Sequence, residues 1–565
     1  MIIEMVHRTV FPGVAQRPER GPTQYTRTLL VLCGLVLLAG LSCGGERGVP
    51  PAGSVEQVYR FRLREDPPTL DPHLAIDQLS EAVLMGLHRG LVELDPGTLQ
   101  VLPAVASSWT ISGDRKTYTF ALRDDVLFHN GRKVISSDVE YSLLRVLRKE
   151  TQAPRRFLLD PIEGASAFTE GKSDGVSGIS TPDEQTVVIR LERPHGPFLS
   201  QLTMLVGAIV PREIYDDPAQ DYLRAPVGCG PFRFEVWQQS HFIEMRAFDG
   251  FFGGRPTLDR VIVRIIENHQ SAFQEYLAGG LDSLDEVPTD EDAPWWPEIE
   301  PQIYRYAMLG TGFLGFNHDL PPFSGNAALR KALNYAVDKK YLWGVLMGGG
   351  NIPANSLLPP GAPAYDPDLP GFPHDPEAAA LLLREAGYPG GEGLDPIALW
   401  INTSEDNRKI AQQIQADIKK IGVELEIREV DWAAYLAAVE GTVDQPGQAQ
   451  MFRLGWYLDY PDPDAILRPL LHSANTGPAG NYARYHNPEV DRLIDEALDL
   501  TDPAAREERY REAERIAIME DAALLLLNFY EESTLFKPYV GGIVTTPMGE
   551  FRIPLERLRI EPRPS

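Results

Sequence analysis

The sequence predicts an α/β protein with more than one lobe and with mixed β-sheets. Runs that alternate apolar and polar residues, typical of half-buried strands, occur at 58–63 and 116–122. Between such runs lie segments with apolar residues at helical spacing, as at 80–91. The elements follow one another without strict βαβ repetition, which favours mixed sheets over one regular parallel sheet. Because single cores seldom exceed about 250–300 residues, a chain of 565 residues is expected to form two or three lobes.

Further elements are expected along the chain from the same two periodicities. Strands are expected at 186–191 and 259–266. Helices are expected from residue 137 onward and at 271–279, 326–346, 376–386, 407–421 and 504–519.

Charge and cysteine content exclude several classes of protein. The formal net charge of −27 repels nucleic acid and anionic membrane surfaces, so we expect no nucleic-acid partner. Cys33 lies within an apolar run, which leaves Cys43 and Cys229 as one pairing at most among the three cysteines. The fold is therefore not built on a disulfide framework, and no Cys/His spacing predicts a zinc site.

The N-terminus has the layout of a secretion signal. Arg17, Arg20 and Arg27 precede an apolar stretch at 28–41, which small residues and Cys43 follow. The cysteine at this place resembles that of a bacterial lipobox, which predicts a signal peptide at 1–42, lipidation of Cys43 and a Gly/Pro-rich linker at 43–54. The alternative is an uncleaved anchor helix, and in either case the protein lies outside the cytoplasm, tethered to a membrane.

Catalytic motifs are missing from the sequence. It contains no HExxH, and the Gly175-Val-Ser177-Gly-Ile segment lacks the last glycine of GxSxG. The segment Gly171-Lys-Ser173 resembles part of a phosphate-binding loop but lacks the first glycine. We therefore expect no enzyme, no cofactor and no metal, although a hydrolase with a spatially assembled triad stays open as an alternative.

Many short motifs, in order over some 500 residues, carry a family resemblance. The chain resembles the large peptide- and nickel-type solute-binding proteins of bacterial ABC importers (family 5), and the oligopeptide-binding branch most. The matching segments are Leu70-Asp-Pro-His73, Gly90-Leu-Val-Glu-Leu-Asp-Pro96, Leu102-Pro-Ala-Val-Ala-Ser-Ser-Trp109, Tyr118-Thr-Phe-Ala-Leu-Arg123, Phe128-His-Asn-Gly131, Val227-Gly-Cys-Gly-Pro-Phe232, Phe252-Gly-Gly-Arg-Pro256, Leu329-Arg-Lys-Ala-Leu-Asn-Tyr-Ala-Val-Asp338, Leu358-Pro-Pro-Gly361 and Gly455-Trp-Tyr-Leu-Asp-Tyr-Pro-Asp-Pro463.

The resemblance implies a two-lobed periplasmic-binding-protein-like fold (type II, cluster C) with an extra subdomain. A hinge joins the lobes, and the chain would cross it near 309–314 and 526–530. Lobe I would comprise 55–88, 206–305 and 527–565, the extra subdomain 89–205, and lobe II 306–526.

A peptide enclosed between lobes buries two charged termini, and each buried charge needs a partner. The resemblance assigns the peptide's amino group to Asp459 and its carboxylate to Arg453. The backbone of Gly455 and Tyr457 would pair with the peptide as an added strand, and Trp456 would form the floor of a side-chain pocket.

Each of these assignments has a structural alternative. Asp459 could begin a turn, Arg453 could form an internal ion pair, and Trp456 could be a core residue. Asp459, Asp462 and Asp464 could together bind calcium, but no bidentate Glu follows at loop spacing. The resemblance also predicts ligand contacts for Ile76 and Asp77. Lone histidines such as His73 and His486 have no partner at the spacing that nickel ligation needs.

These observations predict an extracytoplasmic solute-binding lipoprotein, monomeric, that captures short peptides and delivers them to the permease and ATPase subunits of an ABC importer. The alternative ligand is a non-peptide solute such as an oligosaccharide or a metal complex, because one scaffold serves many ligands. A secreted hydrolase is the alternative from another class.

Overall fold

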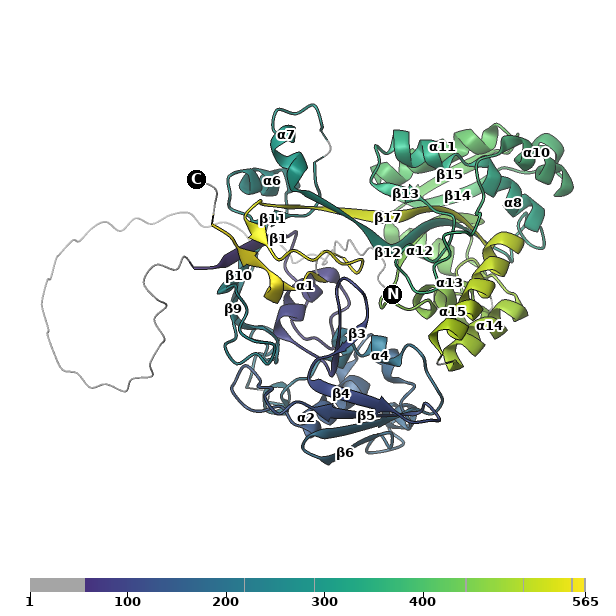
Figure 1. Ribbon diagram of the computed structural model, residues 1–565. Helices are drawn as coiled ribbons and strands as arrows, with labels where there is room; N and C mark the ends of the chain where they lie inside the picture. Colours follow the sequence, from purple (N-terminus) through teal and green to yellow (C-terminus); the bar gives the residue numbers. More distant parts are fainter. Residues whose placement is uncertain are drawn as a thin grey trace, which may run out of the picture. The chain divides into compact units, whose positions relative to one another are not determined.

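Five β-sheets are formed by residues 56–562 of the computed structural model, which describes all of these residues except 218, 289, 443, 444, 501, 550 and 551 (Figure 1). The predicted signal peptide 1–42, the lipidated Cys43 and the linker 43–54 lie outside the described residues. None of the described helices is long and apolar enough to cross a bilayer.

The first sheet has four strands in the order β1-β10-β9-β8. β1 pairs in parallel with β10, and the other two pairings are antiparallel. Alternate residues of these strands are buried against helix α1 in one apolar core, as the period of two in their sequences predicts. The elements are β1 (Val58–Leu63), α1 (Gln78–Leu87), β8 (Phe232–Gln238), β9 (Phe242–Ala247) and β10 (Arg260–Ile265).

A second sheet of four antiparallel strands has the order β4-β5-β7-β6, and helix α2 contacts it. A short hairpin of β2 and β3 precedes it in the chain. These elements are β2 (Val92–Leu94), β3 (Val101–Pro103), β4 (Ala106–Ile111), β5 (Thr117–Leu122), α2 (Ser136–Leu147), β6 (Ile179–Asp183) and β7 (Thr186–Arg190).

The largest sheet has seven strands, in the order β11-β17-β12-β16-β14-β15, with β13 paired to β17. Its bounds are β11 (Ser283–Leu284), β12 (Ile303–Phe316), β13 (Asn351–Pro353), β14 (Ile397–Asn402), β15 (Leu425–Val430), β16 (Met451–Tyr457) and β17 (Leu524–Phe536). A fifth sheet joins β18 (Val540–Gly541) and β19 (Arg559–Ile560).

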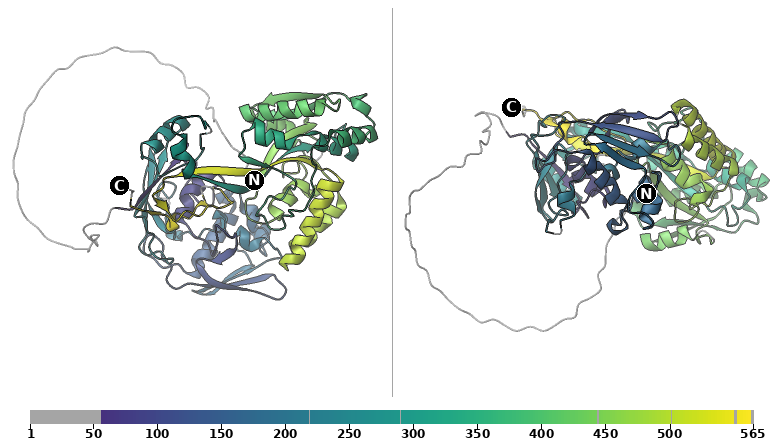
Figure 2. Two further views of the ribbon diagram at one scale, coloured as in Figure 1. Left: turned by 45° about the horizontal axis from the view of Figure 1, so that its top comes forward. Right: turned by 90° about the horizontal axis from the view of Figure 1, so that it is seen from below.

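Two long antiparallel strands, β12 and β17, connect the parts of this sheet, as Figure 1 and the left view of Figure 2 show. Near one end β17 pairs with β11, and further along β12 pairs with β16. Their register shifts between Ala307 and Thr311, beside the predicted crossing at 309–314. The lobe boundaries themselves stay a prediction.

Helices cover the large sheet on both faces. On one face α8, α10 and α11 share an apolar core with strands β14, β15 and β16. The main helices after β12 are α8 (Ala327–Ala336), α10 (Pro376–Glu385), α11 (Glu405–Lys419), α12 (Trp432–Glu440), α13 (Asp464–Leu471), α14 (Pro488–Asp499) and α15 (Pro503–Glu514). The other α-helices of the described residues are α3 (Ala165–Thr169), α4 (Phe198–Gln201), α5 (Arg212–Tyr215), α6 (His269–Leu277), α7 (Trp296–Ile299) and α9 (Lys339–Tyr341).

Two helix predictions are wrong in detail, for reasons of capping. The helix expected at 80–91 begins at Gln78, because the Asp77 side chain accepts the hydrogen bond of the Ser80 backbone N–H and so acts as the N-cap. The single helix expected at 326–346 ends at Ala336. There Val337 takes an extended conformation, and Asp338 caps a new helical segment by accepting from the Tyr341 N–H.

The polar residues of the Leu70-Asp-Pro-His motif are bonded within the protein interior. Asp71 is fully buried and receives two hydrogen bonds from the Arg145 guanidinium of α2, at 3.0 and 2.6 Å. His73 contacts Arg145 through Nδ1 and the Ala208 carbonyl through Nε2. Burial is the main cause that lowers the pKa of His73 to about 4. Both ring nitrogens of His73 are thus engaged within the fold.

This buried pair gives a stability prediction. Asp71→Asn leaves the Arg145 cation without its carboxylate, and breaking one side of a buried pair costs about 3–5 kcal/mol. Chemical denaturation should show the loss. As a control, Asp125→Asn breaks the exposed Arg123–Asp125 pair, whose carboxyl side chain is 51% exposed, and should change stability by less than about 1 kcal/mol. Equal effects of the two substitutions would contradict the structural role of Asp71.

Candidate functional site

Strand β16 carries the sequence motif that the resemblance singles out, and one of its edges pairs with a described strand over only part of its length. On one side it pairs with β12 along its whole length, from Met451 to Tyr457. On the other side its pairing with β14, within the described part of the chain, covers only Met451 and Phe452. The edge beyond Phe452 therefore lies next to no further strand of the described sheet.

The backbone direction of β16 decides which residues face that edge. The even-numbered residues face β12, as the flanking bonds from Asn317 N–H to Gln450 O and from Leu458 N–H to Leu309 O indicate. Since successive residues of a strand point their backbone groups in opposite directions, Arg453, Gly455 and Tyr457 face the other edge. There the Tyr435 hydroxyl donates to the Arg453 carbonyl at 2.5 Å.

Close packing leaves no room for a side chain at residue 455. A Cβ at this position would collide with the hydroxyl of Tyr530 and lie 3.0 Å from its ring carbon Cζ. The Tyr530 ring is stacked on Tyr457, with ring centroids 4.8 Å apart. The Tyr530 ring thus covers the sheet face over Gly455, where a side chain would stand.

Asp459 lies two residues after the end of β16 and belongs to a buried network with three other charged side chains of the described part of the chain. Arg155 donates from Nη2 to Asp459 Oδ1 at 3.2 Å and from Nη1 to Glu81 Oε1 at 3.0 Å. Arg552 donates from Nη2 to Oε2 of Glu81 at 3.1 Å. The side chains of Arg155 and Glu81 are 7% and 3% exposed, and that of Asp459 is 13% exposed.

The charged state of the network follows from mutual pairing. Burial alone raises the pKa of Glu81, but Arg552 and Arg155 lower it more, so the pKa lies below its usual range. Burial lowers the pKa of Arg155, and Glu81 and Asp459 raise it more, so the pKa lies above its usual range. Both groups therefore stay ionised at neutral pH.

The segment before α1 adjoins this network. The same Arg155 nitrogen that contacts Asp459 lies 3.4 Å from the Ile76 carbonyl oxygen. The neighbouring Asp77 carboxylate caps α1 and also accepts from the Ser80 hydroxyl at 2.8 Å. The structure thus brings Ile76 and Asp459, both assigned to the ligand on the resemblance, to one nitrogen atom.

Comparison with known proteins agrees with this architecture. Residues 100–478 match the family model of bacterial extracellular solute-binding proteins, family 5. The chain belongs to this family. The predicted fold class, an α/β periplasmic-binding-protein fold with several mixed sheets, is confirmed.

Individual relatives extend the similarity over most of the chain. The dipeptide-binding protein of Escherichia coli is 29% identical over 489 residues, which cover 83% of this chain and 88% of the relative. Heme-binding protein A of Haemophilus influenzae is 30% identical over 515 residues, 88% of this chain and 91% of the relative. Among solved structures, the periplasmic murein tripeptide binding protein MppA in its unliganded open form superposes with a TM-score of 0.78 at 25% identity, covering 90% of this chain and 99% of MppA.

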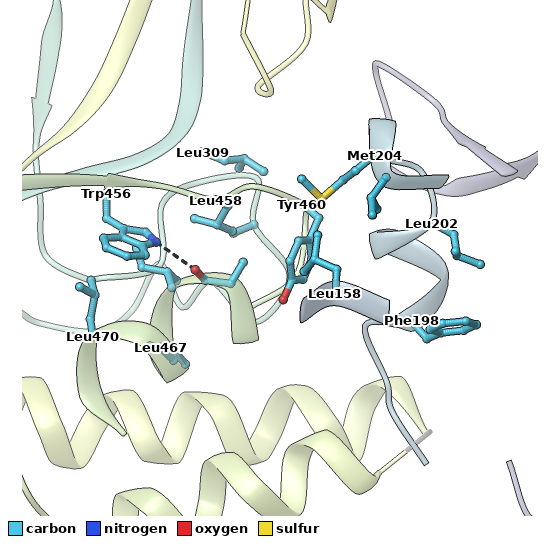
Figure 3. Close-up of a cluster of buried hydrophobic side chains, with 14 of the residues drawn as sticks. Leu158, Phe198, Leu202, Met204, Leu309, Trp456, Leu458, Tyr460, Leu467 and Leu470 are labelled. Carbon is cyan, nitrogen blue, oxygen red and sulfur yellow. Dashed lines mark hydrogen bonds between the residues drawn. The ribbon is translucent and has the colours of Figure 1, made fainter. Parts of the chain in front are cut away.

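Trp456 and Arg453, to which the resemblance also assigns ligand contacts, differ in exposure in this family 5 protein. Trp456 is 5% exposed, lies in an apolar core with Leu309 and Leu458, and donates from Nε1 to the Ala465 carbonyl at 2.9 Å (Figure 3). Arg453 is half-buried, forms no ion pair with any described residue, and its Nε has no hydrogen-bond partner among them. Their ligand contacts stay predictions.

The remaining acidic residues of the motif are engaged in ion pairs. Asp462 receives two hydrogen bonds from Arg506, at 2.6 and 2.7 Å, and Asp464 accepts from Arg468 at 2.9 Å. The described residues hold no group of three or more His, Cys, Asp or Glu side chains that could bind a metal ion. Asp462 and Asp464 thus act as structural partners of two arginines.

Cys229 lies in the protein interior. Its side chain is fully buried, and burial raises the pKa of its thiol to about 12. A thiol with this pKa is almost entirely protonated at neutral pH and is a poor nucleophile.

Sequence reasoning missed three residues of the charged network: Glu81, Arg155 and Arg552. Their partners are far away along the chain: Arg155 and Asp459 are separated by 304 positions, and Arg552 and Glu81 by 471. A local pattern cannot indicate such a pairing. The only available signal was that Glu81 lies on the buried face of a predicted helix and so needs a cationic partner.

The strand edge gives a packing prediction. Gly455→Ala forces the Tyr530 ring away from Tyr457, and overpacking of this kind costs about 1–3 kcal/mol of stability. Tyr530→Phe removes the hydroxyl that meets the new methyl group, so it should recover part of the loss in the double variant while having a small effect alone. Thermal and denaturant unfolding of the four proteins measures this. Strictly additive losses would show that Tyr530 is not the group that excludes a side chain at residue 455.

Proposed function

We propose that this protein is an extracytoplasmic lipoprotein that captures short peptides between two lobes and delivers them to the permease and ATPase subunits of an ABC importer. The observation that carries the proposal is the position of a buried carboxylate, Asp459, at the end of a strand edge that a peptide backbone can extend. The proposed lobes are 55–88 with 206–305 and 527–565, and 306–526, with 89–205 as the extra subdomain.

The carboxylate supports a ligand with a free amino group. Asp459 is 13% exposed at its side chain, and an ammonium group that enters such a site loses its hydration shell. It must regain the lost free energy through charge-assisted hydrogen bonds to the protein. The Asp459 carboxylate and the Ile76 carbonyl are two acceptors suited to this group.

The strand edge supports a peptide backbone. Gly455 and Tyr457 face it, and backbone groups recognise a peptide independently of its side chains. With its amino group at Asp459, the peptide would run antiparallel to β16, toward Arg453. The half-buried Arg453 guanidinium, without an ion pair among the described residues, would then bind the peptide carboxylate.

The names of the relatives support peptides as the ligand class. One relative is a dipeptide-binding protein and one solved neighbour binds a murein tripeptide. The Haemophilus relative is named for heme, which makes a non-peptide solute the second candidate. A primary amino group distinguishes the two, because peptides carry it and heme does not.

Modification of the ligand's amino group tests the proposal. N-acetylation removes the positive charge that Asp459 would bind, and loss of one partner of a buried charge pair costs about 2–5 kcal/mol, roughly thirty-fold to several thousand-fold in affinity. Asp459→Asn should weaken binding of free peptides by a similar factor. Acetylation should then cost the variant much less, a non-additivity measurable by calorimetry on the four combinations.

Three outcomes separate the alternatives. Equal binding of free and acetylated peptides by the unmutated protein would reject the role of Asp459 and favour the non-peptide solute. Purely additive losses would assign Asp459 a structural role only. Recovery of cleaved peptide at catalytic ratios would favour a hydrolase, since transport requires that the peptide be released intact.

Membrane attachment gives a separate prediction. Cys43 follows an apolar run and small residues, so we expect its acylation and exposure outside the cytoplasmic membrane. Cys43→Ala should release soluble protein or leave the precursor uncleaved, which fractionation and intact mass measure. Membrane partitioning and mobility that do not change on substitution would contradict a lipid anchor at Cys43.

A further inference from the structure

Residues 351–358 form a segment, which we call the strap, that lies against the two long strands of the large sheet. Its first part is β13, which pairs with β17. Beyond β13 the Ala354 N–H donates to the Leu527 carbonyl of β17 at 3.1 Å, and the Thr311 hydroxyl of β12 donates to the Leu357 carbonyl at 2.8 Å. The strap therefore contacts both long strands where the chain is predicted to cross between lobes.

A buried carboxylate without a counter-ion holds the second half of the strap. Glu514, the last residue of α15, is 1% exposed and forms no ion pair with any described residue. Its Oε1 atom accepts from the N–H groups of Leu357 and Leu358 at 2.5 and 2.9 Å, and it lies 2.9 Å from the Ser356 hydroxyl. All three donors belong to the strap, so release of the strap would leave this carboxylate to water.

A buried ammonium group holds the strap at Ala354. Lys339, the first residue of α9, is 7% exposed, and its Nζ donates to the Ala354 carbonyl at 2.9 Å. Within the described part of the chain, Lys339 forms no ion pair with a carboxylate. A cation thus binds a carbonyl of the strap and an anion binds its amide groups, and each ion lacks the counter-ion that a buried charge usually has.

Burial disfavours the charged form of both groups. It raises the pKa of Glu514 to about 7, an effect to which Asp366 adds and which the three strap donors oppose. Burial also lowers the pKa of Lys339 to about 8. Asp366 and Tyr365 are the ionisable groups that face Glu514 from the segment after the strap. Both groups that hold the strap are therefore close to their titration points at neutral pH.

We propose that the strap is a proton-controlled clamp on β12 and β17, held by Glu514 and Lys339 and released most easily when both are charged. Release lets each ion regain the hydration that it lacks in the interior. Protonation of Glu514, or deprotonation of Lys339, removes this gain and keeps the strap closed. Three consecutive glycines precede the strap, at 348–350, with φ angles of 71°, 87° and 82°, so the backbone that leads into it has the conformational freedom that release requires.

This device goes beyond the proposed transport function and applies to any ligand. The strap contacts both predicted crossings, so its release would free the two strands to bend there. Movement of the predicted lobes would therefore depend on the pH outside the cytoplasm, with the least restraint near neutrality.

Hydrogen exchange of the strap amides measures release as a function of pH. The closed strap gains from Glu514 below its ordinary pKa of 4.5, and the gain is lost as the pH rises to about 7. It gains from Lys339 as the pH rises above about 8. After correction for intrinsic exchange rates, protection of the Leu357 and Leu358 amides should pass through a minimum between these two values. At the minimum, protection should be about ten-fold or more below that at about pH 5.

Two substitutions each remove one side of this profile. Glu514→Gln keeps an acceptor for the strap amides but carries no charge, so the loss of protection between about pH 5 and 7 should disappear. Lys339→Met keeps an unbranched side chain without charge, so the rise above about pH 8 should disappear. Should Lys339→Met not fold, Glu514→Gln still tests the acidic side.

Matched control variants lie next to both groups. Glu507→Gln makes the same change on the same helix at a partly exposed side chain, and Lys340→Gln alters the exposed neighbour of Lys339. Both should keep the full profile. The peptic fragments that cover the strap are compared with those from β5 in the same mass spectra.

Two results would overturn the proposal. One is strap protection that does not change with pH, or that changes equally in the unmutated protein and in Glu514→Gln. The other is a profile that β5 shares in full, because the whole protein and not the strap would then respond to the protons. Exchange is measured without ligand, so a failure of peptide binding leaves this test valid.

Discussion

Burial of charge at Glu81 is the constraint on which the arrangement of the site depends. Its side chain is 3% exposed, and an isolated carboxylate in such surroundings is costly enough that cationic partners are obligatory. Arg155 and Arg552 supply them from segments 74 and 471 residues away along the chain. Helix α1, the segment before η2 (Arg156–Leu159) and the C-terminal segment are therefore held around one acidic group, and Asp459 joins them through Arg155.

The second component of the proposed site is backbone. In the proposed function the edge of β16 at Gly455 and Tyr457 would bond to a peptide main chain, through groups that every residue has. Recognition by such an edge is insensitive to side chains, so discrimination has to come from the terminal charges of the ligand. This division fits a family whose members carry names as different as dipeptide-, murein tripeptide- and heme-binding protein. The scaffold is common to them, and in the proposed function Asp459 and Arg453 would supply the selection.

The sequence predicted the periodic elements well and the charge network poorly, for a physical reason. Strands and helices follow from spacing within about ten residues, and β10 (Arg260–Ile265) and α10 (Pro376–Glu385) lie within a residue or two of the ranges expected for them. Caps were less predictable, because Asp77 and Ser80 are both good N-caps and only the backbone conformation decides between them. Asp459 was identified through its motif. Arg155 was not, because its role exists only through partners 74 and 304 residues away.

A comparison among the buried aspartates of the family motifs supports the proposed ligand contact of Asp459 over one at Asp71 or Asp462. Asp71 takes two hydrogen bonds from Arg145, and Asp462 takes two from Arg506; neither arginine has another carboxylate partner among the described residues. A ligand cation that took Asp71 or Asp462 would leave a buried arginine without its counter-ion, which is strongly unfavourable. Asp459 shares its arginine with Glu81. Loss of the Asp459 contact would leave Arg155 paired with Glu81, which supports Asp459, rather than Asp71 or Asp462, as the proposed acceptor of a ligand cation.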